Sequence, residues 1–146
     1  MGRISLPLSL IGRRLYADKH TVADLSVDEY GVWVVFPGEG GAVMVGEVVE
    51  EELRLGGTWL VSGVKQGEVG ESFVACGVLY FLESGHEKFS SLHFSFDIFT
   101  QNKTESSEKL EFINPYAMTT MLQYDPLTDS LLSWDKGRQL TYPLLI

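Results

Sequence analysis

Short apolar runs alternate along the chain with clusters of glycine, proline and acidic residues, a pattern typical of β-strands joined by tight turns. Residues 92–97 (LHFSFD) alternate apolar and polar side chains with the period of a half-buried strand. Less regular strand-like runs cover residues 43–49, 53–61, 109–113, 117–123 and 139–145. The distribution of apolar residues therefore predicts an all-β protein.

Clusters rich in glycine and acidic residues predict the turns between these strands. They lie at residues 37–41, 56–57, 83–85 and 135–137. The most polar stretch, residues 100–108, is expected to form an exposed hairpin loop. Residues 48–55 are the one helix candidate, and the glycine pair after them would end it. The apolar run at residues 4–11 is expected to be a strand and turn, because no cleavage site of a targeting segment follows it.

Three segments each combine a turn with apolar, strand-like residues, and together they indicate a repeat. They cover residues 28–36, 72–81 and 125–135. The spacing is 46 residues from Gly31 to Gly77 and 53 residues from Gly77 to Ser130. Repeats of this length are typical of β-propeller blades, each a four-stranded antiparallel sheet, and the chain would hold about three.

Three blades would not close a ring, because known propellers have about four to eight. An open ring would leave apolar faces and sheet edges exposed to solvent. The chain is therefore expected either to oligomerise or to be a piece of a longer product, and its abrupt beginning favours the piece.

Composition adds a limit on the partners. Of the 146 residues, 45% are hydrophobic and 12% aromatic, which supports a folded domain with a core. The 20 acidic and 11 basic residues give a net charge of −9. Nucleic acid and anionic membrane surfaces require basic patches and are not expected partners, whereas a cation or a basic protein is compatible. No run approaches the roughly 20 apolar residues that span a bilayer, so membrane insertion is not expected.

Five sequence motifs follow one another along the chain. They are residues 23–34 (ADLSVDEYGVWV), 73–80 (FVACGVLY), 94–97 (FSFD), 119–126 (TTMLQYDP) and 131–142 (LLSWDKGRQLTY). In order and spacing they resemble the C-terminal part of the olfactomedin-like domain family. The resemblance covers nearly the whole chain after residue 20, and residues 1–20 carry little of it.

The resemblance implies a five-bladed β-propeller, of which this chain would hold about three blades. Residues 1–146 would be a single olfactomedin-like domain that lacks its N-terminal part. Domains of the family are extracellular, bind secreted or membrane-displayed proteins in adhesion, matrix and signalling settings, and have no established catalytic activity. We therefore expect a secreted, non-catalytic protein-interaction module, with oligomers formed only through segments upstream of this chain.

The resemblance also implies a calcium ion in the central channel, held by the oxygen ligands that this hard cation prefers. The family's ligand positions fall on Asp24, Glu71, the carbonyl of Ser72, the carbonyl of Leu122, and Gln123. Gln123 departs from the family pattern, which has an aspartate at this position. Because calcium binding weakens as ligand charge is lost, the alternatives are a weakened site and a lost site whose residues are hydrogen-bonded or hydrated.

A catalytic alternative uses two of the same residues. Five-bladed propellers elsewhere include glycosidases, whose chemistry needs two carboxyl groups roughly 5 to 10 Å apart. Asp24 and Glu71 could form such a pair across the channel. If both carboxylates bind calcium, they are not free to act as general acid and base, so a test for the metal separates the two hypotheses.

Two further residues are candidates for covalent modification. Cys76 is the one cysteine of the sequence, and by itself indicates either a buried thiol or half of a disulfide whose partner lies outside this chain. The resemblance implies the disulfide, with a cysteine near the N-terminus of the domain. Asn102 begins the sequon Asn102-Lys103-Thr104 and is a candidate glycosylation site.

The remaining aromatic and acidic residues of the motifs have structural interpretations. Trp33, Trp59 and Trp134 are expected to anchor the cores of successive blades, the alternative being a ligand cage. Asp28 and Glu29 are expected to organise the turn that follows them.

Overall fold

The computed structural model describes residues 14–17 and 21–144. Within these ranges the chain folds into antiparallel β-sheets and contains no α-helix, so the predicted all-β class is confirmed. The predicted strand at residues 4–11 lies outside the described residues.

Three sheets form from consecutive strands, so that every connection within a sheet is a local turn. The first sheet contains β1 (Asp24–Asp28), β2 (Gly31–Pro37), β3 (Ala42–Val49) and β4 (Arg54–Lys65), with a short 3₁₀ turn (Glu39–Gly41) between β2 and β3. The second contains β5 (Glu71–Ala75), β6 (Val78–Leu82), β7 (Phe89–Asp97) and β8 (Asn102–Ile113). The third contains β9 (Thr119–Asp125), β10 (Ser130–Asp135) and β11 (Arg138–Pro143).

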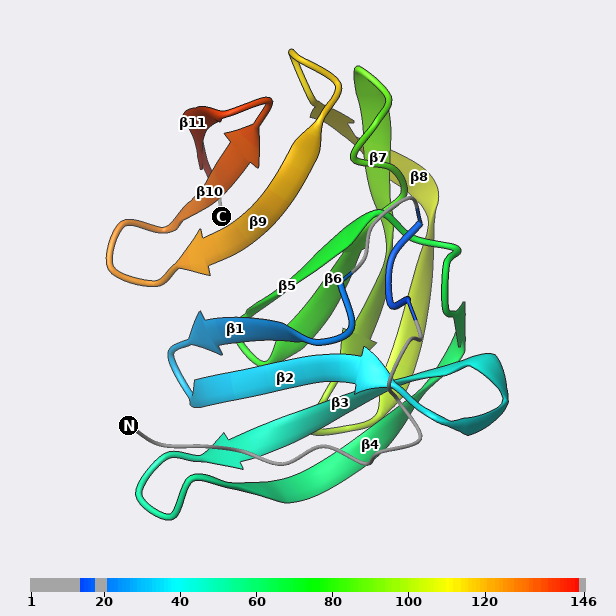
Figure 1. Cartoon of the computed structure of the whole chain (residues 1–146), viewed down its shortest axis with the longest axis vertical. Helices are drawn as coiled ribbons and strands as arrows, with labels where there is room; N and C mark the ends of the chain where they lie inside the picture. The colour runs from blue at the N-terminus through cyan, green and yellow to red at the C-terminus, as the bar shows by residue number, and fades with distance from the viewer. Residues whose placement is uncertain (1–13, 18–20, 145–146) are drawn as a thin grey trace.

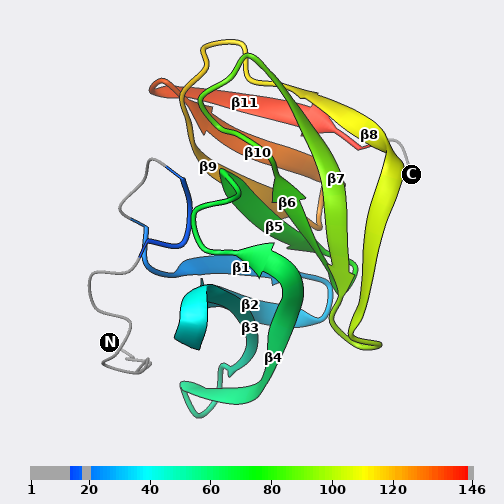
Figure 2. The ribbon, with the colours of Figure 1, turned by 90° about the vertical axis from the view of Figure 1, so that its right-hand side faces the viewer.

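The first strand of each sheet lies at the centre of the molecule. β1 contacts both β5 and β9, and β5 contacts β9, while the later strands of each sheet extend outward (Figure 1). In the side view the same three strands again lie next to one another (Figure 2). Sheets arranged in this way are consistent with part of a β-propeller.

The sequence repeat corresponds to one structural position in the three sheets. Gly31 opens β2, Gly77 lies in the β5–β6 turn, and Ser130 opens β10. All three therefore mark the turn between the first and second strands of a sheet. The predicted periodicity is the spacing of the sheets.

Two apolar clusters fill the spaces between neighbouring sheets. The cluster between the first and second sheets includes Trp33, Val35, Val43, Val45 and Val61 on one side and Val74, Leu79, Phe81, Phe94, Phe96 and Ile98 on the other. The cluster between the second and third sheets includes Phe73, Ala75, Leu82, Phe112, Leu122, Tyr124 and Leu131. Each fully buried large apolar side chain contributes about 1.5–3 kcal/mol, so these two layers provide most of the cohesion between the sheets.

The helix predicted at residues 48–55 is wrong. β3 continues to Val49 and β4 begins at Arg54, and the residues between them form a turn in which Leu53 has a positive φ of 50°. Val48 pairs with Leu55 and Val49 with Arg54 across this hairpin. The strand preference of the β-branched residues and the pairing across the hairpin outweigh the helix preference of the glutamates in the turn.

The loop predicted at residues 100–108 is also wrong for most of its length. The turn ends at Gln101, and β8 begins at Asn102, which pairs with Asp97 of β7. β8 is the outermost strand of its sheet, and edge strands commonly carry polar residues that discourage pairing with other chains. The polarity of this stretch therefore reflects its place at the sheet edge.

The tryptophans behave differently from one another. Trp33 is 3% exposed and lies in the core between the first and second sheets, and Trp59 packs against that core. Trp134 is 43% exposed, so its predicted role as a core anchor is wrong. Its strand, β10, alternates its side chains between two faces, and Leu131 and Ser133 are on the buried one.

The turn between β1 and β2 fastens the first sheet to the second through Asp28. This side chain is 5% exposed. Its Oδ1 accepts hydrogen bonds from the Trp33 indole (2.8 Å) and the Tyr30 amide (2.9 Å), and its Oδ2 accepts one from the Gly77 amide (2.7 Å). Asp28 thus organises its own turn, as predicted, and also joins it to the β5–β6 turn of the neighbouring sheet.

Replacing Asp28 by asparagine is expected to lower the free energy of unfolding by about 2 kcal/mol. The side-chain NH2 group of asparagine would replace one carboxylate oxygen, and it cannot accept the hydrogen bond that a buried N–H group now donates to that oxygen. The measurement is urea unfolding followed by tryptophan fluorescence. Glu51→Gln, in the exposed β3–β4 turn, removes the same charge and serves as the control. Equal stability of the two variants would contradict the assigned role.

Candidate functional site

The five residues predicted to hold calcium all lie on the three central strands. Asp24 is the first residue of β1, Glu71 and Ser72 are the first two of β5, and Leu122 and Gln123 lie within β9. Because these strands contact one another, the fold brings together residues that are separated by almost 100 positions in the sequence. The placement therefore agrees with a site at the centre of the molecule.

A tyrosine outside the predicted set connects the two acidic strands. The hydroxyl group of Tyr16 donates a hydrogen bond to Oδ2 of Asp24 at 2.5 Å and lies 2.6 Å from the Oγ atom of Ser72. The side chains of Tyr16, Glu71 and Ser72 are each at most 3% exposed. Tyr16 precedes the recognisable motifs, and nothing in the local sequence pattern identified it.

The surroundings of Tyr16 keep its hydroxyl group protonated. Burial raises the pKa of this phenol well above its usual value, and the negative charges of Asp24 and Glu71 raise it further. The proton therefore remains available to the carboxylate of Asp24 at neutral pH. The carboxyl groups of Asp24 and Glu71 thus both lie close enough to one phenol to influence its ionisation.

Of the two predicted ligands on β9, the Gln123 side chain has another contact. The Gln123 amide nitrogen donates a hydrogen bond to the carbonyl oxygen of Leu25 at 2.7 Å, which ties β9 to β1. The side chain of Leu122 is fully buried in the core between the second and third sheets. In the part of the chain that the structure describes, no three His, Cys, Asp or Glu side chains gather as a metal site would require. A calcium ion here would depend on two carboxylates supplemented by amide and carbonyl oxygens.

A second polar cluster lies at the other end of the central strands, around Glu29. Its Oε2 atom accepts a hydrogen bond from the amide of Cys76 (3.0 Å), and its Oε1 atom accepts one from the hydroxyl of Tyr124 (2.5 Å). The same hydroxyl is 3.0 Å from Oδ1 of Asp129 in the β9–β10 turn. Glu29 therefore joins its own turn to the β5–β6 turn of the second sheet and to β9 of the third, whereas the sequence predicted a role only in its own turn.

The turn at Cys76 and Gly77 is shaped to receive carboxylates. Both residues have positive φ angles, 52° and 74°, so that their successive N–H groups point toward the β1–β2 turn. These N–H groups bind Glu29 and Asp28, respectively. A concave pair of adjacent amides of this kind favours anions, and here both anions come from the protein itself.

Cys76 is an exposed free thiol in this structure, so the alternative of a buried thiol is wrong. Loss of hydration raises its pKa, and the negative charge of Glu29 raises it further. Hydrogen bonding, first of all from Tyr124, lowers the pKa of Glu29. The turn therefore holds a carboxylate beside a protonated thiol of low nucleophilicity.

The other predictions from sequence concern the surface. Asn102, the candidate glycosylation site, is exposed at the start of β8, next to the β7–β8 turn. Across residues 14–17 and 21–144, no helix is long and apolar enough to pass through a bilayer.

Three antiparallel sheets with their first strands in contact define an all-β protein with a propeller-like arrangement. The sequence model of the olfactomedin-like domain matches residues 3–146. The chain therefore belongs to the olfactomedin-like domain family, and the resemblance found in the sequence motifs is confirmed.

Several relatives are myocilins. Myocilin of Rattus norvegicus is 32% identical over 127 residues, which cover 86% of this chain and 25% of that protein. Myocilin of Canis lupus familiaris is 32% identical and that of Homo sapiens 30% identical over the same length, covering 26% and 25% of those proteins. This chain thus spans about a quarter of the length of the relatives it matches.

Replacing Tyr16 by phenylalanine is expected to lower the free energy of unfolding at pH 7 by about 1–2 kcal/mol, because the contacts of its hydroxyl with Asp24 and Ser72 are lost. Above about pH 10 the unfolded chain loses the tyrosine proton while the folded protein, whose Tyr16 pKa is raised, keeps it. The stability from this hydroxyl is fully present below pH 10 and decreases at higher pH. The difference in the free energy of unfolding between wild type and Tyr16→Phe should therefore become smaller as pH rises above about 10.

Urea unfolding between pH 7 and pH 11 measures this dependence. Tyr116→Phe, which removes the hydroxyl of an exposed tyrosine, is the control. A difference between wild type and Tyr16→Phe that stays constant with pH would show that Tyr16 is not ionised preferentially in the unfolded chain.

Proposed function

We propose that this chain forms about three blades of a five-bladed olfactomedin-type propeller and acts as a secreted, non-catalytic protein-interaction module. The observation that carries the proposal is the membership of residues 3–146 in the olfactomedin-like domain family. The chain covers only a quarter of the length of its myocilin relatives, so we assign it no partner of theirs. The partner that we propose is an extracellular or membrane-displayed protein. Its chemistry is basic or mixed in charge, since this chain has a net charge of −9.

One end of the molecule supports an interaction role. The turns that follow the first and third strands of the sheets lie at this end, and each of four turns carries a large exposed apolar side chain. They are Tyr30 (64% exposed), Leu53 (44%), Phe99 (59%) and Leu127 (93%). Exposed apolar groups gathered on loops above a rigid scaffold are typical of protein-binding surfaces.

An extracellular setting gives roles to two surface residues. Asn102 is accessible for glycosylation at the start of β8. Cys76 is accessible for a disulfide with a cysteine outside this chain. Both modifications are part of the proposal and depend on export of the protein.

The contacts of the two central acids favour binding over catalysis. Asp24 accepts a hydrogen bond from Tyr16, and the side chain of Glu71 is 3% exposed. A general acid or base has to reach a substrate and exchange protons with solvent during turnover. The glycosidase hypothesis for Asp24 and Glu71 is therefore the weaker of the two.

We further propose that the central strands bind calcium through Asp24, Glu71, Gln123 and the carbonyl groups of Ser72 and Leu122. The support is the meeting of these positions on three adjacent strands and the presence of two carboxyl groups close to Tyr16. The ion would neutralise two carboxylates and bridge the first strands of the sheets.

Thermal melting in calcium and then in chelator tests this site. Binding to the folded state stabilises by linkage, by about 2.7 kcal/mol at a hundredfold excess over Kd, so calcium should raise the melting temperature by several degrees. Asp24→Asn should abolish the increase, whereas Asp125→Asn, at the end of β9 beside the β9–β10 turn, should keep it. An increase of the same size in both variants, or none in wild type, would contradict the site.

Cell-surface binding tests the interaction role. Fluorescently labelled protein is expected to bind cultured cells saturably, and protease treatment of the cells should remove the binding.

An activity assay tests the catalytic alternative. A panel of aryl glycosides incubated with the same protein should release no aglycone. Turnover that Glu71→Gln abolishes would instead establish the catalytic hypothesis.

A further inference from the structure

A pocket walled by aromatic rings lies at the boundary between the first and second sheets. Its volume is about 360 Å³. Its described lining comes from β2, β3 and β4, from the β1–β2 turn and from the β7–β8 turn: Trp33, Glu47, Trp59, Tyr30, Ile98 and Phe99. Four of these six side chains are aromatic, and one is charged.

The rings of the pocket are packed against one another, although two of them are largely exposed. Tyr30 and Phe99 meet edge to face with 4.9 Å between ring centroids. Trp33 lies 6.1 Å from Phe99 and 6.4 Å from Trp59. Tyr30 is 64% exposed and Phe99 59% exposed. The protein thus keeps large aromatic surfaces in water at a fixed mutual orientation, which is the usual state of a binding surface that lacks its partner.

Two glycines leave room for two of the rings. A Cβ atom at Gly77 would lie 2.4 Å from the Phe99 ring, so the absence of a side chain there lets this ring rest on the β5–β6 turn. A Cβ atom at Gly57 would lie 2.8 Å from the Trp59 indole, which folds back over β4. These two rings therefore rest directly against backbone that carries no side chain.

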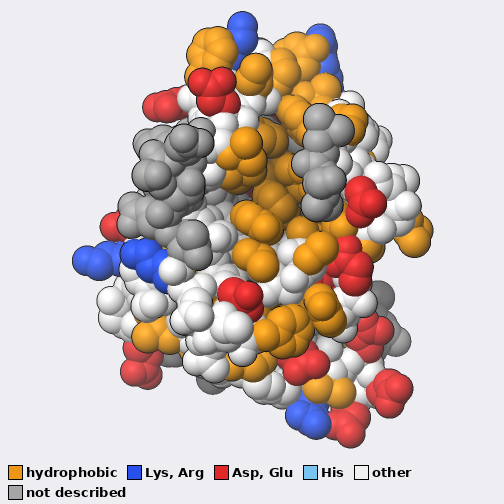
Figure 3. Space-filling view, turned by 180° about the vertical axis from the view of Figure 1, so that it is seen from behind, with side chains coloured by type: hydrophobic (Ala, Val, Ile, Leu, Met, Phe, Trp, Pro, Cys, Tyr) orange, Lys and Arg blue, Asp and Glu red, His pale blue; other side chains and the backbone are white. Residues whose placement is uncertain are grey.

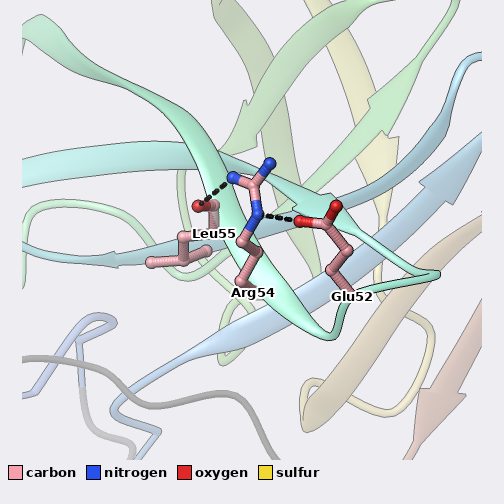
Figure 4. Close-up of polar contacts among 3 residues, drawn as sticks. All are labelled: Glu52, Arg54 and Leu55. Atoms are coloured by element: carbon pink, nitrogen blue, oxygen red, sulfur yellow. Dashed lines mark hydrogen bonds and ion pairs between the residues drawn. The ribbon is translucent and has the colours of Figure 1, made fainter.

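Glu47 gives the pocket its charge. It pairs with Trp33 across β2 and β3, and it lies at the irregularity between Gly46 and Val48 where β3 shifts register against β4. Such bulges redirect side chains. No described residue forms a hydrogen bond or an ion pair with the side-chain carboxylate of Glu47. Arg54, on the neighbouring strand, instead contacts Glu52 and the carbonyl of Leu55 (Figure 4).

We propose that this pocket, named here the aromatic–acid pocket, receives an arginine side chain of a protein partner. Aromatic faces attract a cation and stack on the planar guanidinium group, and a carboxylate pairs with its N–H groups. Acidic side chains are spread over the surface in Figure 3, while described Lys and Arg residues lie at its margins. The inference rests on the proposed protein-interaction function and specifies which surface and which chemistry serve it.

Titration of the purified protein with the peptide acetyl-Gly-Gly-Arg-Gly-Gly-amide tests the pocket. The indole N–H signals of Trp33 and Trp59 should shift in the NMR spectrum, while that of Trp134, outside the pocket, should not. A peptide with citrulline in place of arginine keeps the shape and loses the charge, and it should bind at least about fivefold more weakly. Absence of indole shifts at millimolar peptide, or equal binding of the citrulline peptide, would overturn the proposal.

Four variants separate the pocket from general surface effects. Glu47→Gln and Phe99→Ala should each weaken the arginine peptide about fivefold, since each removes one source of cation binding. Glu111→Gln and Phe89→Ala remove an exposed acid and an exposed ring outside the pocket, and they should leave the affinity unchanged. Equal effects in both pairs would overturn the assignment.

Cell-surface binding with the same variants distinguishes the pocket from the broader function. Weaker binding by Glu47→Gln and Phe99→Ala, with the control pair unaffected, supports docking through the pocket. If wild type and Glu47→Gln bind cells equally, the interaction function stands and the pocket is not its docking site. If wild type does not bind cells, the proposed function fails, and the peptide titration still decides the chemistry of the pocket.

Discussion

The three sheets share no strand pairing, so contacts at their boundaries have to join them, and β1 with the turn after it supplies several of these contacts. Each ladder of backbone hydrogen bonds stays within its own sheet. Across the boundaries, the Val74 amide donates to Ser26, the Gly77 amide to Asp28, and the Cys76 amide to Glu29. Apolar layers between the sheets supply the cohesion, and these directed bonds fix the angle and register at which the sheets meet.

The same short strand therefore places both candidate sites. At its start, Asp24 meets Tyr16 and the acidic end of β5, where the calcium proposal lies. At its other end, the turn that Asp28 anchors presents Tyr30 to Phe99 and forms one wall of the aromatic–acid pocket. A change in how β1 docks would move both sites together, because neither is contained in a single sheet.

The sequence predicted the features that depend on local pattern. The repeat of turn and apolar strand located the same turn in each sheet, and the motifs identified the family. The helix prediction at residues 48–55 was wrong because Val48 pairs with Leu55 in the β3–β4 hairpin. Such pairing between strands cannot be read from the sequence of one strand alone. The polar stretch at residues 100–108 was misassigned because an edge strand need not bury a face. Tyr16 and the aromatic–acid pocket depend on contacts between distant segments and had no local signal.

The role of β1 as the link between sheets can be tested by hydrogen exchange measured by NMR. The amides of Cys76 and Gly77 lie in a two-residue turn with no ladder partner, where free amides exchange rapidly. Because Glu29 and Asp28 accept hydrogen bonds from them, these two amides should be protected to a degree similar to that of the adjoining strands. Exchange at the rate of an unprotected turn would show that the turns are not joined in solution, and it would contradict the account.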